Sequence, residues 1–234
     1  MGALNMPGDL LARLAALDSC ACSDAMDQLG LAGVARGLRA LTVARAVTGP
    51  VVTVALGPAG ATPTAGSAGG AGRHLGTAAI EAAAPGDVIV VAAGGRIDAA
   101  GWGGVLSLAA TMRGVSAVIV DGACRDVDES TALGLPVYAL AAVPATARGR
   151  QAEVGWNLPV DVAGIPVSPG DFVVADGSGV VFIPAGRAAD VIAAAERIAA
   201  REVAMADRLR AGESASAVLS ADYEQLLSGR EDSS

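Results

Sequence analysis

Residues 94–129 read GGRIDAAGWGGVLSLAATMRGVSAVIVDGACRDVDE, and this stretch decides the fold. GWGG (101–104) has the flexible backbone that often opens a helix, and we expect that helix at about residues 103–113. The apolar, β-branched run at 117–121 is typical of a buried strand, and a second helix is expected near 126–133. Loops, helices and strands in alternation predict a mixed α/β domain.

The segments on either side continue this alternation without a long repeat. CSDAMDQLG (22–30) predicts a short helix with Ser23 or Asp24 as N-cap and Gly30 as its stop. Further helices are expected at residues 8–18, 73–84, 186–212 and 215–227, the third with Ile192, Ala195, Ile198, Val203 and Leu209 on one stripe. Strands are expected at residues 46–56, 136–140 and 160–167, and a low-complexity loop at 57–72. A polar tail follows at 229–234.

Two segments share the order Pro-Gly-Asp, a strand and a glycine turn. They are APGDVIVVAAGG (84–95) and SPGDFVVADGSG (168–179). Pro followed by Gly is the signature of a type II turn, so each segment predicts a turn that leads into a buried strand. We interpret them as two independent turns of one type and not as a duplication.

The composition excludes several chemistries. All 16 basic residues are arginine, so a Schiff-base aldolase, a pyridoxal-phosphate anchor and a Walker-A loop cannot be built from this chain. The single histidine, His74, excludes a metal site made of several histidines. Small residues dominate: 53% of the chain is hydrophobic, only 3% is aromatic, and the mean hydropathy is +0.51.

The charge and the cysteines bear on partners and compartment. A net charge of −8 argues against nucleic acid and anionic membranes as partners and suits small acids bound in a local arginine pocket. Three cysteines give neither a disulfide framework nor a zinc pattern. The N-terminus lacks the features of a secretory signal, and prolines interrupt the uncharged stretches at 49–72 and 130–147. We therefore expect a cytoplasmic protein.

The pair Arg125–Asp126 is the strongest chemical signal. It follows a buried strand and lies downstream of GWGG, where unpaired helix amides would attract an anion. A carboxylate can hold a hard divalent cation, while a guanidinium can pair with a substrate carboxylate or a developing enolate. The alternative is a surface ion pair at a helix start, and spacing alone does not decide between the two.

The run WGG…RGV…VIVDGACRDVDE resembles the RraA-like family, which includes class II 4-hydroxy-4-methyl-2-oxoglutarate aldolases and the regulator of ribonuclease activity A. SDAMDQLG (23–30), AVTGPVVTV, PGDVIVVAAGG and PGDFVVADGSGVVFIP (169–184) resemble further family motifs, so the likeness covers about residues 20–215. It implies one layered α/β sandwich of the swivelling β/β/α type over residues 1–234. It also implies homotrimers or homohexamers with active sites between subunits.

The resemblance assigns roles to individual residues. Arg125 matches the family's substrate-binding arginine, and Asp126 matches its ligand to Mg²⁺ or Mn²⁺. Gly103, Gly104, Val105 and Leu106 match the loop whose amides receive the substrate carboxylate, and Glu202 resembles an acid contributed by a neighbouring subunit. Aldolase members carry an acid 21 residues before the arginine, and here that position is Gly104.

The implied activity is that of a metal-dependent lyase. It would cleave a C–C bond in a small 2-oxo dicarboxylic acid through a metal-stabilised pyruvate enolate, as in 4-hydroxy-4-methyl-2-oxoglutarate aldolase or oxaloacetate decarboxylase. Because Gly104 removes an acid, two alternatives stay open. One is another enzyme on the same scaffold that acts on a metal-chelating hydroxy or oxo acid, and the other is a non-catalytic protein that regulates a ribonuclease.

Other polar residues in this region have both a structural and a functional interpretation. Asp121, Asp98 and His74 could support the metal or move a proton, and Arg96 could contact substrate; strand capping, solvated loop charges and a structural histidine are the alternatives. Trp102 is expected to pack beneath the loop and Cys124 to act as an apolar spacer. Ser23 and Asp24 are expected to cap a helix first and to serve a site second.

Overall fold

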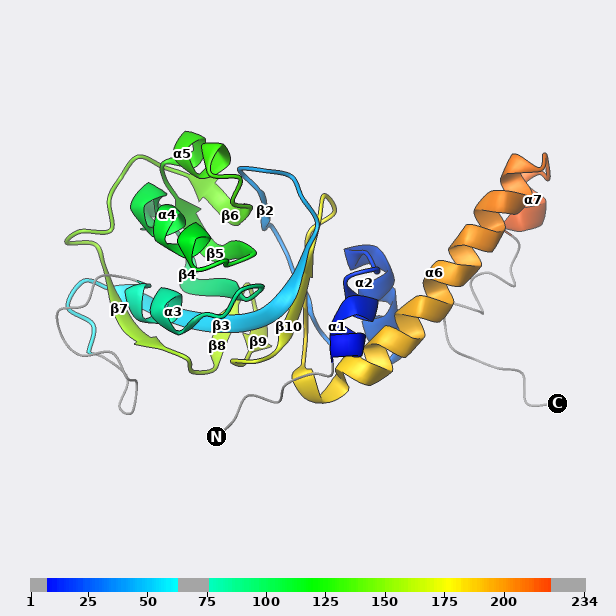
Figure 1. The fold of residues 1–234 in the computed structure, drawn as a ribbon, viewed down its shortest axis with the longest axis horizontal. Helices are drawn as coiled ribbons and strands as arrows, with labels where there is room; N and C mark the ends of the chain where they lie inside the picture. The colour runs from blue at the N-terminus through cyan, green and yellow to red at the C-terminus, as the bar shows by residue number, and fades with distance from the viewer. Residues whose placement is uncertain (1–7, 63–75, 220–234) are drawn as a thin grey trace.

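The computed structural model describes residues 8–62 and 76–219, and its architecture is mixed α/β (Figure 1). The helices are α1 Gly8–Leu14, α2 Ser19–Gln28, α3 Thr77–Ala82, α4 Gly104–Met112, α5 Val127–Ala132, α6 Ala188–Arg210 and α7 Ala215–Val218, with a 3-10 turn at Ala185–Arg187. The strands are β1 Val34–Ala35, β2 Arg39–Ala40, β3 Val47–Pro58, β4 Val88–Trp102, β5 Ala117–Cys124, β6 Val137–Ala142, β7 Gln151–Trp156, β8 Val160–Val162, β9 Ile165–Val167, β10 Phe172–Ala175 and β11 Val180–Ile183.

Strand β3 joins the two halves of the main sheet. The strand order is β1-β11-β10-β3-β4-β5-β6-β2, and β7 also pairs with β3. The first residues of β3 pair antiparallel with β10, whereas residues 51–55 pair parallel with β4. Strands β4, β5 and β6 continue the parallel part, so helices α4 and α5 follow the carboxyl ends of adjacent strands.

Three apolar clusters define the layers. Helices α3 and α4 bury Ile80 and Leu106 against one face of the parallel strands. The opposite face packs against the β8–β9 hairpin, with Val162 and Val167 fully buried. Helices α1, α2 and α6 cover the outer side of β10 and β11. The predicted layered α/β class of the β/β/α type is therefore confirmed.

Both Pro-Gly-Asp turns form as the sequence predicts. Gly86 and Gly170 have φ values of +95° and +86°, the left-handed region that a type II turn requires at this position. In each turn the aspartate accepts a hydrogen bond from the amide three residues earlier, at 2.8 Å for Asp87 and 2.7 Å for Asp171. The two turns lead into β4 and β10, which lie on either side of β3.

Four predictions of local structure need correction. Asp18 and not Ser23 or Asp24 caps α2, because its side chain accepts from the amide of Ala21 at 2.8 Å. The expected strand 160–167 is the two-strand hairpin β8–β9, since Ala163 and Gly164 both have positive φ. Strand β5 continues past residue 121 to Cys124. Helix α7 ends at Val218, and residues 220–234 lie outside the described residues, as do 63–75.

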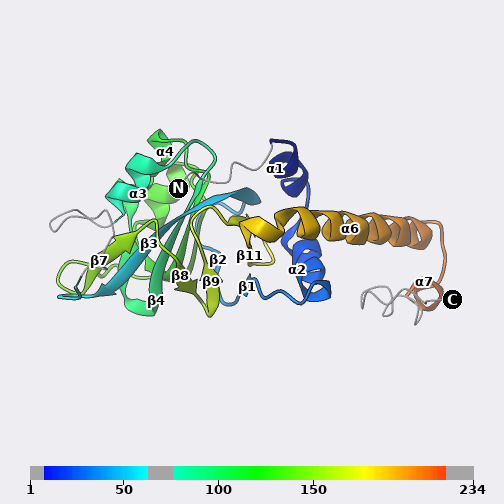
Figure 2. The same ribbon diagram turned by 90° about the horizontal axis from the view of Figure 1, so that it is seen from below.

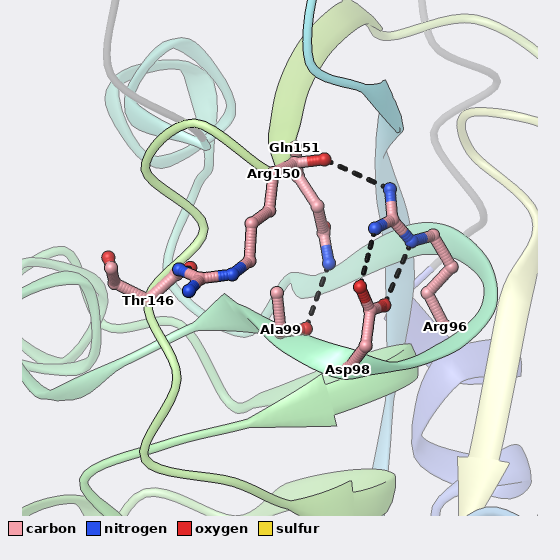
Figure 3. A network of polar contacts seen from close by, with 6 residues as sticks. All are labelled: Arg96, Asp98, Ala99, Thr146, Arg150 and Gln151. Atoms are coloured by element: carbon pink, nitrogen blue, oxygen red, sulfur yellow. Dashed lines mark hydrogen bonds and ion pairs between the residues drawn. The ribbon is translucent and has the colours of Figure 1, made fainter.

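The segment after Gly94–Gly95 was predicted to be a loop, but it is a bulged continuation of β4. Both glycines are left-handed, with φ of +62° and +74°, and the pairing of β4 with β5 shifts register three times between Ala92 and Trp102. The side-chain amide of Gln151 donates to Ala99 O at 2.8 Å and so fixes the returning part of the bulge (Figure 3). The strand β7 that carries Gln151 was not predicted.

Helix α6 begins against the sheet and extends away from it (Figures 1 and 2). Ile192, Ala195 and Ile198 of the predicted stripe are buried against α1, α2 and β10–β11. Val203 and Leu209, further along the same stripe, are 61% and 41% exposed because the helix has passed the end of the body.

A partly buried hydrogen-bond cluster fixes α2 to the β10–β11 hairpin. The carboxylate of Asp176 accepts from Ser19 N and Ser19 Oγ, each at 2.7 Å, and from Ser178 N at 2.8 Å. Partial burial alone would raise the pKa of Asp176, but these hydrogen bonds outweigh it and the pKa is lowered.

Replacing Asp176 with asparagine is expected to lower the free energy of unfolding by about 1–3 kcal/mol at pH 7, because charge-assisted hydrogen bonds are lost. A carboxyl whose pKa is lowered by folding stabilises the fold above its unfolded pKa and loses that contribution as the pH falls through the folded value. The difference between the two proteins should therefore shrink below about pH 4, as urea unfolding at several pH values would measure. Asp190→Asn, which removes only an exposed ion pair with Arg187, is the matched control; a constant difference down to pH 2 would contradict the assignment.

Candidate active site

The candidate site lies where β4 and β5 end and helices α4 and α5 begin. In open α/β sheets this carboxyl edge is the usual place for ligands. Gly103 precedes α4 in an extended conformation and provides no side-chain cap. Asp126 precedes α5 in the left-handed region, with φ +55°, which a short polar residue tolerates better than an apolar one.

The carboxylate of Asp126 joins the two helix starts. Its Oδ2 accepts a hydrogen bond from Gly104 N at 2.9 Å and another from Arg125 Nε at 3.1 Å. The amide of Gly104 and the guanidinium of Arg125 lower the pKa of Asp126 despite its partial burial. Asp126 is thus an ionised oxygen donor at neutral pH.

Close approach of the backbone explains why glycine occupies positions 103 and 104. A Cβ on Gly103 would lie 2.9 Å from Asp126 Oδ2 and 3.0 Å from Arg125 Cγ. A Cβ on Gly104 would lie 3.1 Å from Asp126 Cβ and would overlap Oε2 of Glu129. The glycines therefore allow the start of α4 to reach the Arg125–Asp126 pair.

Several donors at this edge remain available for a ligand. Within residues 8–62 and 76–219, the amides of Val105 and Leu106 have no protein acceptor, as expected for the first turn of a helix. Over the same ranges, the two terminal nitrogens of Arg125 have no acceptor either, since only Nε binds Asp126. The arrangement can receive a carboxylate from two directions.

A buried hydroxyl network holds this edge in place. Trp102 Nε1 donates to Ser107 Oγ at 3.0 Å, and Ser107 Oγ lies 2.8 Å from Ser130 Oγ, so β4, α4 and α5 are linked. The amide of Arg125 also donates to Trp102 O at 3.0 Å. The predicted packing role of Trp102 is confirmed, because only 2% of the residue is exposed. Sequence reasoning did not identify Ser107 and Ser130.

Asp121 and Asp98 do not join Asp126. Asp121 lies on the face of β5 that packs against the β8–β9 hairpin, where burial raises its pKa while the amides of Ala163 and Gly95 oppose that rise. Asp98 makes a two-point ion pair with Arg96, at 3.0 and 2.7 Å, and Arg96 also donates to Arg150 O at 3.0 Å (Figure 3). The side chains of Arg96 and Asp98 thus bind each other on the bulge.

The remaining candidates lie elsewhere in the chain. Glu202 is on the exposed part of α6, where partial burial and the charges of Asp18 and Asp24 raise its pKa. Among the described residues of a single chain, Glu202 has no interaction with Asp126. Cys124 is buried as the predicted apolar spacer, and burial raises the pKa of its thiol to about 11. His74 lies outside the described residues.

Glu129 is a site residue that sequence reasoning missed. It lies in the first turn of α5, inside the run DVDE, and its carboxylate lies over Gly104. The signal was the i+3 spacing from Asp126, which places both acids at the same end of one helix.

The donors at this edge suit a hard divalent cation. Mg²⁺ and Mn²⁺ prefer carboxylate oxygens and are commonly held by only one or two of them. Among residues 8–62 and 76–219, no three His, Cys, Asp or Glu side chains form a metal-binding group, so water, substrate or another subunit would have to complete the coordination.

Comparisons with known proteins point in one direction. The sequence profile of the RraA-like family, described as Aldolase/RraA, matches residues 19–182. A protein of Halalkalibacterium halodurans, provisionally named a 4-hydroxy-4-methyl-2-oxoglutarate aldolase, is 31% identical over 210 residues, which cover 87% of this chain and 91% of that protein. The protein DlpA of Legionella pneumophila is 28% identical over 184 residues, 79% of this chain, but the chain spans only 29% of its length.

The fold has solved relatives as well. The crystal structure of Streptomyces coelicolor RraAS2, described as an unusual member of the RNase ES inhibitor RraA protein family, has a TM-score of 0.72 at 27% identity. The match covers 84% of this chain and 95% of that protein.

No helix in the described ranges has the length and apolar character needed to cross a membrane.

Proposed function

The chain belongs to the RraA-like family, and from this premise we propose that it is a divalent-cation-dependent lyase. The proposed reaction cleaves a C–C bond in a small 2-oxo dicarboxylic acid, as in 4-hydroxy-4-methyl-2-oxoglutarate aldolase or oxaloacetate decarboxylase. The observation that carries the proposal is the Asp126 carboxylate, ionised and fixed between Gly104 N and Arg125 Nε at the end of β5.

Asp126 is the residue that would hold Mg²⁺ or Mn²⁺. When bound there, the cation would supply Lewis-acid polarisation of the substrate's keto oxygen. The chain has no lysine, so an iminium on the protein cannot take that role. The left-handed backbone at Asp126 aims its carboxylate toward the start of α4 and away from the first turn of its own helix.

Arg125 and the start of α4 would bind and orient the substrate. The free terminal nitrogens of Arg125 can pair with a carboxylate or with the enolate oxygen that develops during cleavage. The amides of Val105 and Leu106, at the positive end of the helix dipole, can receive a carboxylate without any side chain. With these two sets of donors, the site would bind a small dicarboxylic substrate by the carboxylates at both of its ends.

The site is proposed to be completed by a neighbouring subunit in a homotrimer or homohexamer. Beside the free amides, the outer side of α4 presents three exposed apolar side chains: Val105 at 82%, Leu108 at 47% and Met112 at 80% exposure. Contiguous exposed apolar residues commonly mark interfaces. Glu202 of a second copy is the acid that the family resemblance would place near Asp126.

A direct assay tests the proposed function. The purified protein is incubated with Mg²⁺ or Mn²⁺ and either oxaloacetate or 4-hydroxy-4-methyl-2-oxoglutarate, and pyruvate is followed with lactate dehydrogenase. We expect cation-dependent pyruvate formation that a chelator abolishes. Cation binding without pyruvate would favour another enzyme for metal-chelating acids on this scaffold.

A non-catalytic regulator of a ribonuclease is the second candidate. The likeness to a member of the RNase ES inhibitor RraA family and the loss of the acid at Gly104 favour it. Failure to bind Mn²⁺ at all, in a folded protein, would support this candidate over the lyase.

Placing aspartate at both Leu108 and Met112 is expected to dissociate the assembly and to lower pyruvate formation at least about tenfold, because a charge in an apolar interface is costly to desolvate. Light scattering coupled to size-exclusion chromatography measures the mass, and circular dichroism checks the fold. Ile97→Asp changes another exposed apolar residue, 55% exposed on the β4 bulge, and serves as the control. An unchanged mass would contradict the interface on α4.

A further inference from the structure

Glu129 lies in the space that a side chain at position 104 would fill. A Cβ built on Gly104 would overlap Glu129 Oε2 and would lie 3.0 Å from Glu129 Cδ. Gly104 is the first residue of α4 and Glu129 belongs to the first turn of α5, so the two helices bring these positions together. The sequence has glycine at position 104, where aldolase members of the family have an acid. In the structure, the carboxylate of Glu129 occupies the space beside that position.

The Glu129 carboxylate also has no interaction partner among the described residues. Within residues 8–62 and 76–219 it has neither a hydrogen-bond partner nor an ion-pair partner, although Arg125 is close in sequence. Asp98, for which the sequence left open a role in supporting the metal or moving a proton, instead forms an ion pair with Arg96. Glu129 therefore has free carboxylate oxygens, and it is the acid that lies over Gly104 beside Asp126.

We propose that Glu129 provides the second carboxylate of the candidate active site, from α5 and not from position 104. This inference rests on the proposed function, because it assumes that Asp126 holds a divalent cation. Mg²⁺ and Mn²⁺ are commonly bound through one or two carboxylates, and Glu129 adds the second hard oxygen donor on the open side of Asp126.

A purely structural role makes a different prediction. An acid in the first turn stabilises a helix through the dipole, and that contribution appears in thermal stability but not in cation affinity. The test therefore measures both quantities. Isothermal titration with Mn²⁺ alone gives the affinity without any substrate, and thermal unfolding in the absence of metal gives the stability.

Glu129→Gln keeps the shape of the side chain and removes its charge. We expect its Mn²⁺ affinity to fall by about tenfold or more, the loss typical of groups that support a metal ligand. Asp128→Asn removes the same charge from the adjacent exposed residue and should leave the affinity within about twofold. Equal losses in both variants would mean a general effect of charge and would overturn the inference.

A double variant makes the argument specific to position 104. Glu129→Ala together with Gly104→Asp returns the carboxylate to α4: the removal of Glu129 relieves the overlap, and a small shift of the Asp126 Cβ, 3.1 Å away, accommodates the new side chain. We expect Mn²⁺ affinity within about threefold of the unaltered protein, against a tenfold loss for Glu129→Ala alone. No recovery would contradict the exchange of positions.

The outcomes also separate this inference from the proposed function. If Asp126→Asn loses Mn²⁺ binding while Glu129→Gln retains full affinity, only the inference about Glu129 fails. If the unaltered protein binds no Mn²⁺, or if Asp126→Asn binds it unchanged, the proposed function fails with it.

Discussion

Asp126→Asn is expected to lower cation-dependent pyruvate formation by about three orders of magnitude while the protein stays folded. Loss of the cation removes Lewis-acid stabilisation worth several kcal/mol, and each ~1.4 kcal/mol is a factor of ten in rate. Asparagine keeps an oxygen that can accept from Gly104 N and tolerates the left-handed backbone at φ +55°. The variant therefore isolates the loss of charge.

Asp126→Ala should lose activity to the same extent but should also lose stability. Alanine cannot accept the Gly104 hydrogen bond, and a left-handed alanine costs about 1 kcal/mol or more. Comparing kcat with the thermal unfolding temperature for both variants separates chemistry from folding. Activity of Asp126→Asn within tenfold of the unaltered protein, at saturating Mn²⁺, would contradict the assignment of Asp126 as cation ligand.

The parts of the fold that sequence predicted well are those with strong local signals. The helix expected at 103–113 is α4 at Gly104–Met112, and both Pro-Gly-Asp turns form because their glycines must adopt positive φ. The Arg125–Asp126 pair was also correctly expected after a buried strand, although β5 runs to Cys124, past the predicted end at residue 121, so that the pair follows the strand directly.

The errors arise where tertiary contacts override local pattern. Gly94 and Gly95 suggested the end of a strand, yet Gln151 on the unpredicted strand β7 holds the chain in a bulge. Asp121 is next to the site in sequence but faces the β8–β9 hairpin, because successive residues of a strand point to opposite faces.

The site itself shows what spacing cannot reveal. Gly104 signalled a missing acid, and only the packing of α4 against α5 brings Glu129 into that space. The hydroxyl pair Ser107–Ser130 is equally invisible in sequence, because each serine alone suits a solvent-exposed helix position. Contacts between helices that follow adjacent parallel strands decide both cases.

The proposed role of Arg125 can be tested with one substitution to lysine, a residue that the chain otherwise lacks. Introducing lysine at position 125 keeps the positive charge but removes the planar fork, which can hold Asp126 through Nε while its terminal nitrogens hold a substrate. We expect kcat/KM for pyruvate formation to fall by about 100-fold, because paired charge-assisted hydrogen bonds are lost. Mn²⁺ affinity should change by less than about threefold, since Asp126 keeps its carboxylate and its Gly104 hydrogen bond.

The split between kcat and KM identifies what Arg125 stabilises. An arginine that binds only the substrate carboxylate would raise KM and leave kcat unchanged, whereas one that also meets the developing enolate lowers kcat as well. The two free terminal nitrogens of Arg125 and the amides of Val105 and Leu106 form separate donor sites, so the amides can still hold the substrate carboxylate when the fork is lost. We therefore expect most of the loss in kcat. Arg96→Lys, on the bulge and paired with Asp98, is the matched control and should change neither kcat nor KM by more than about twofold. If Arg125→Lys raised KM and left kcat unchanged, Arg125 would not take part in the chemical step.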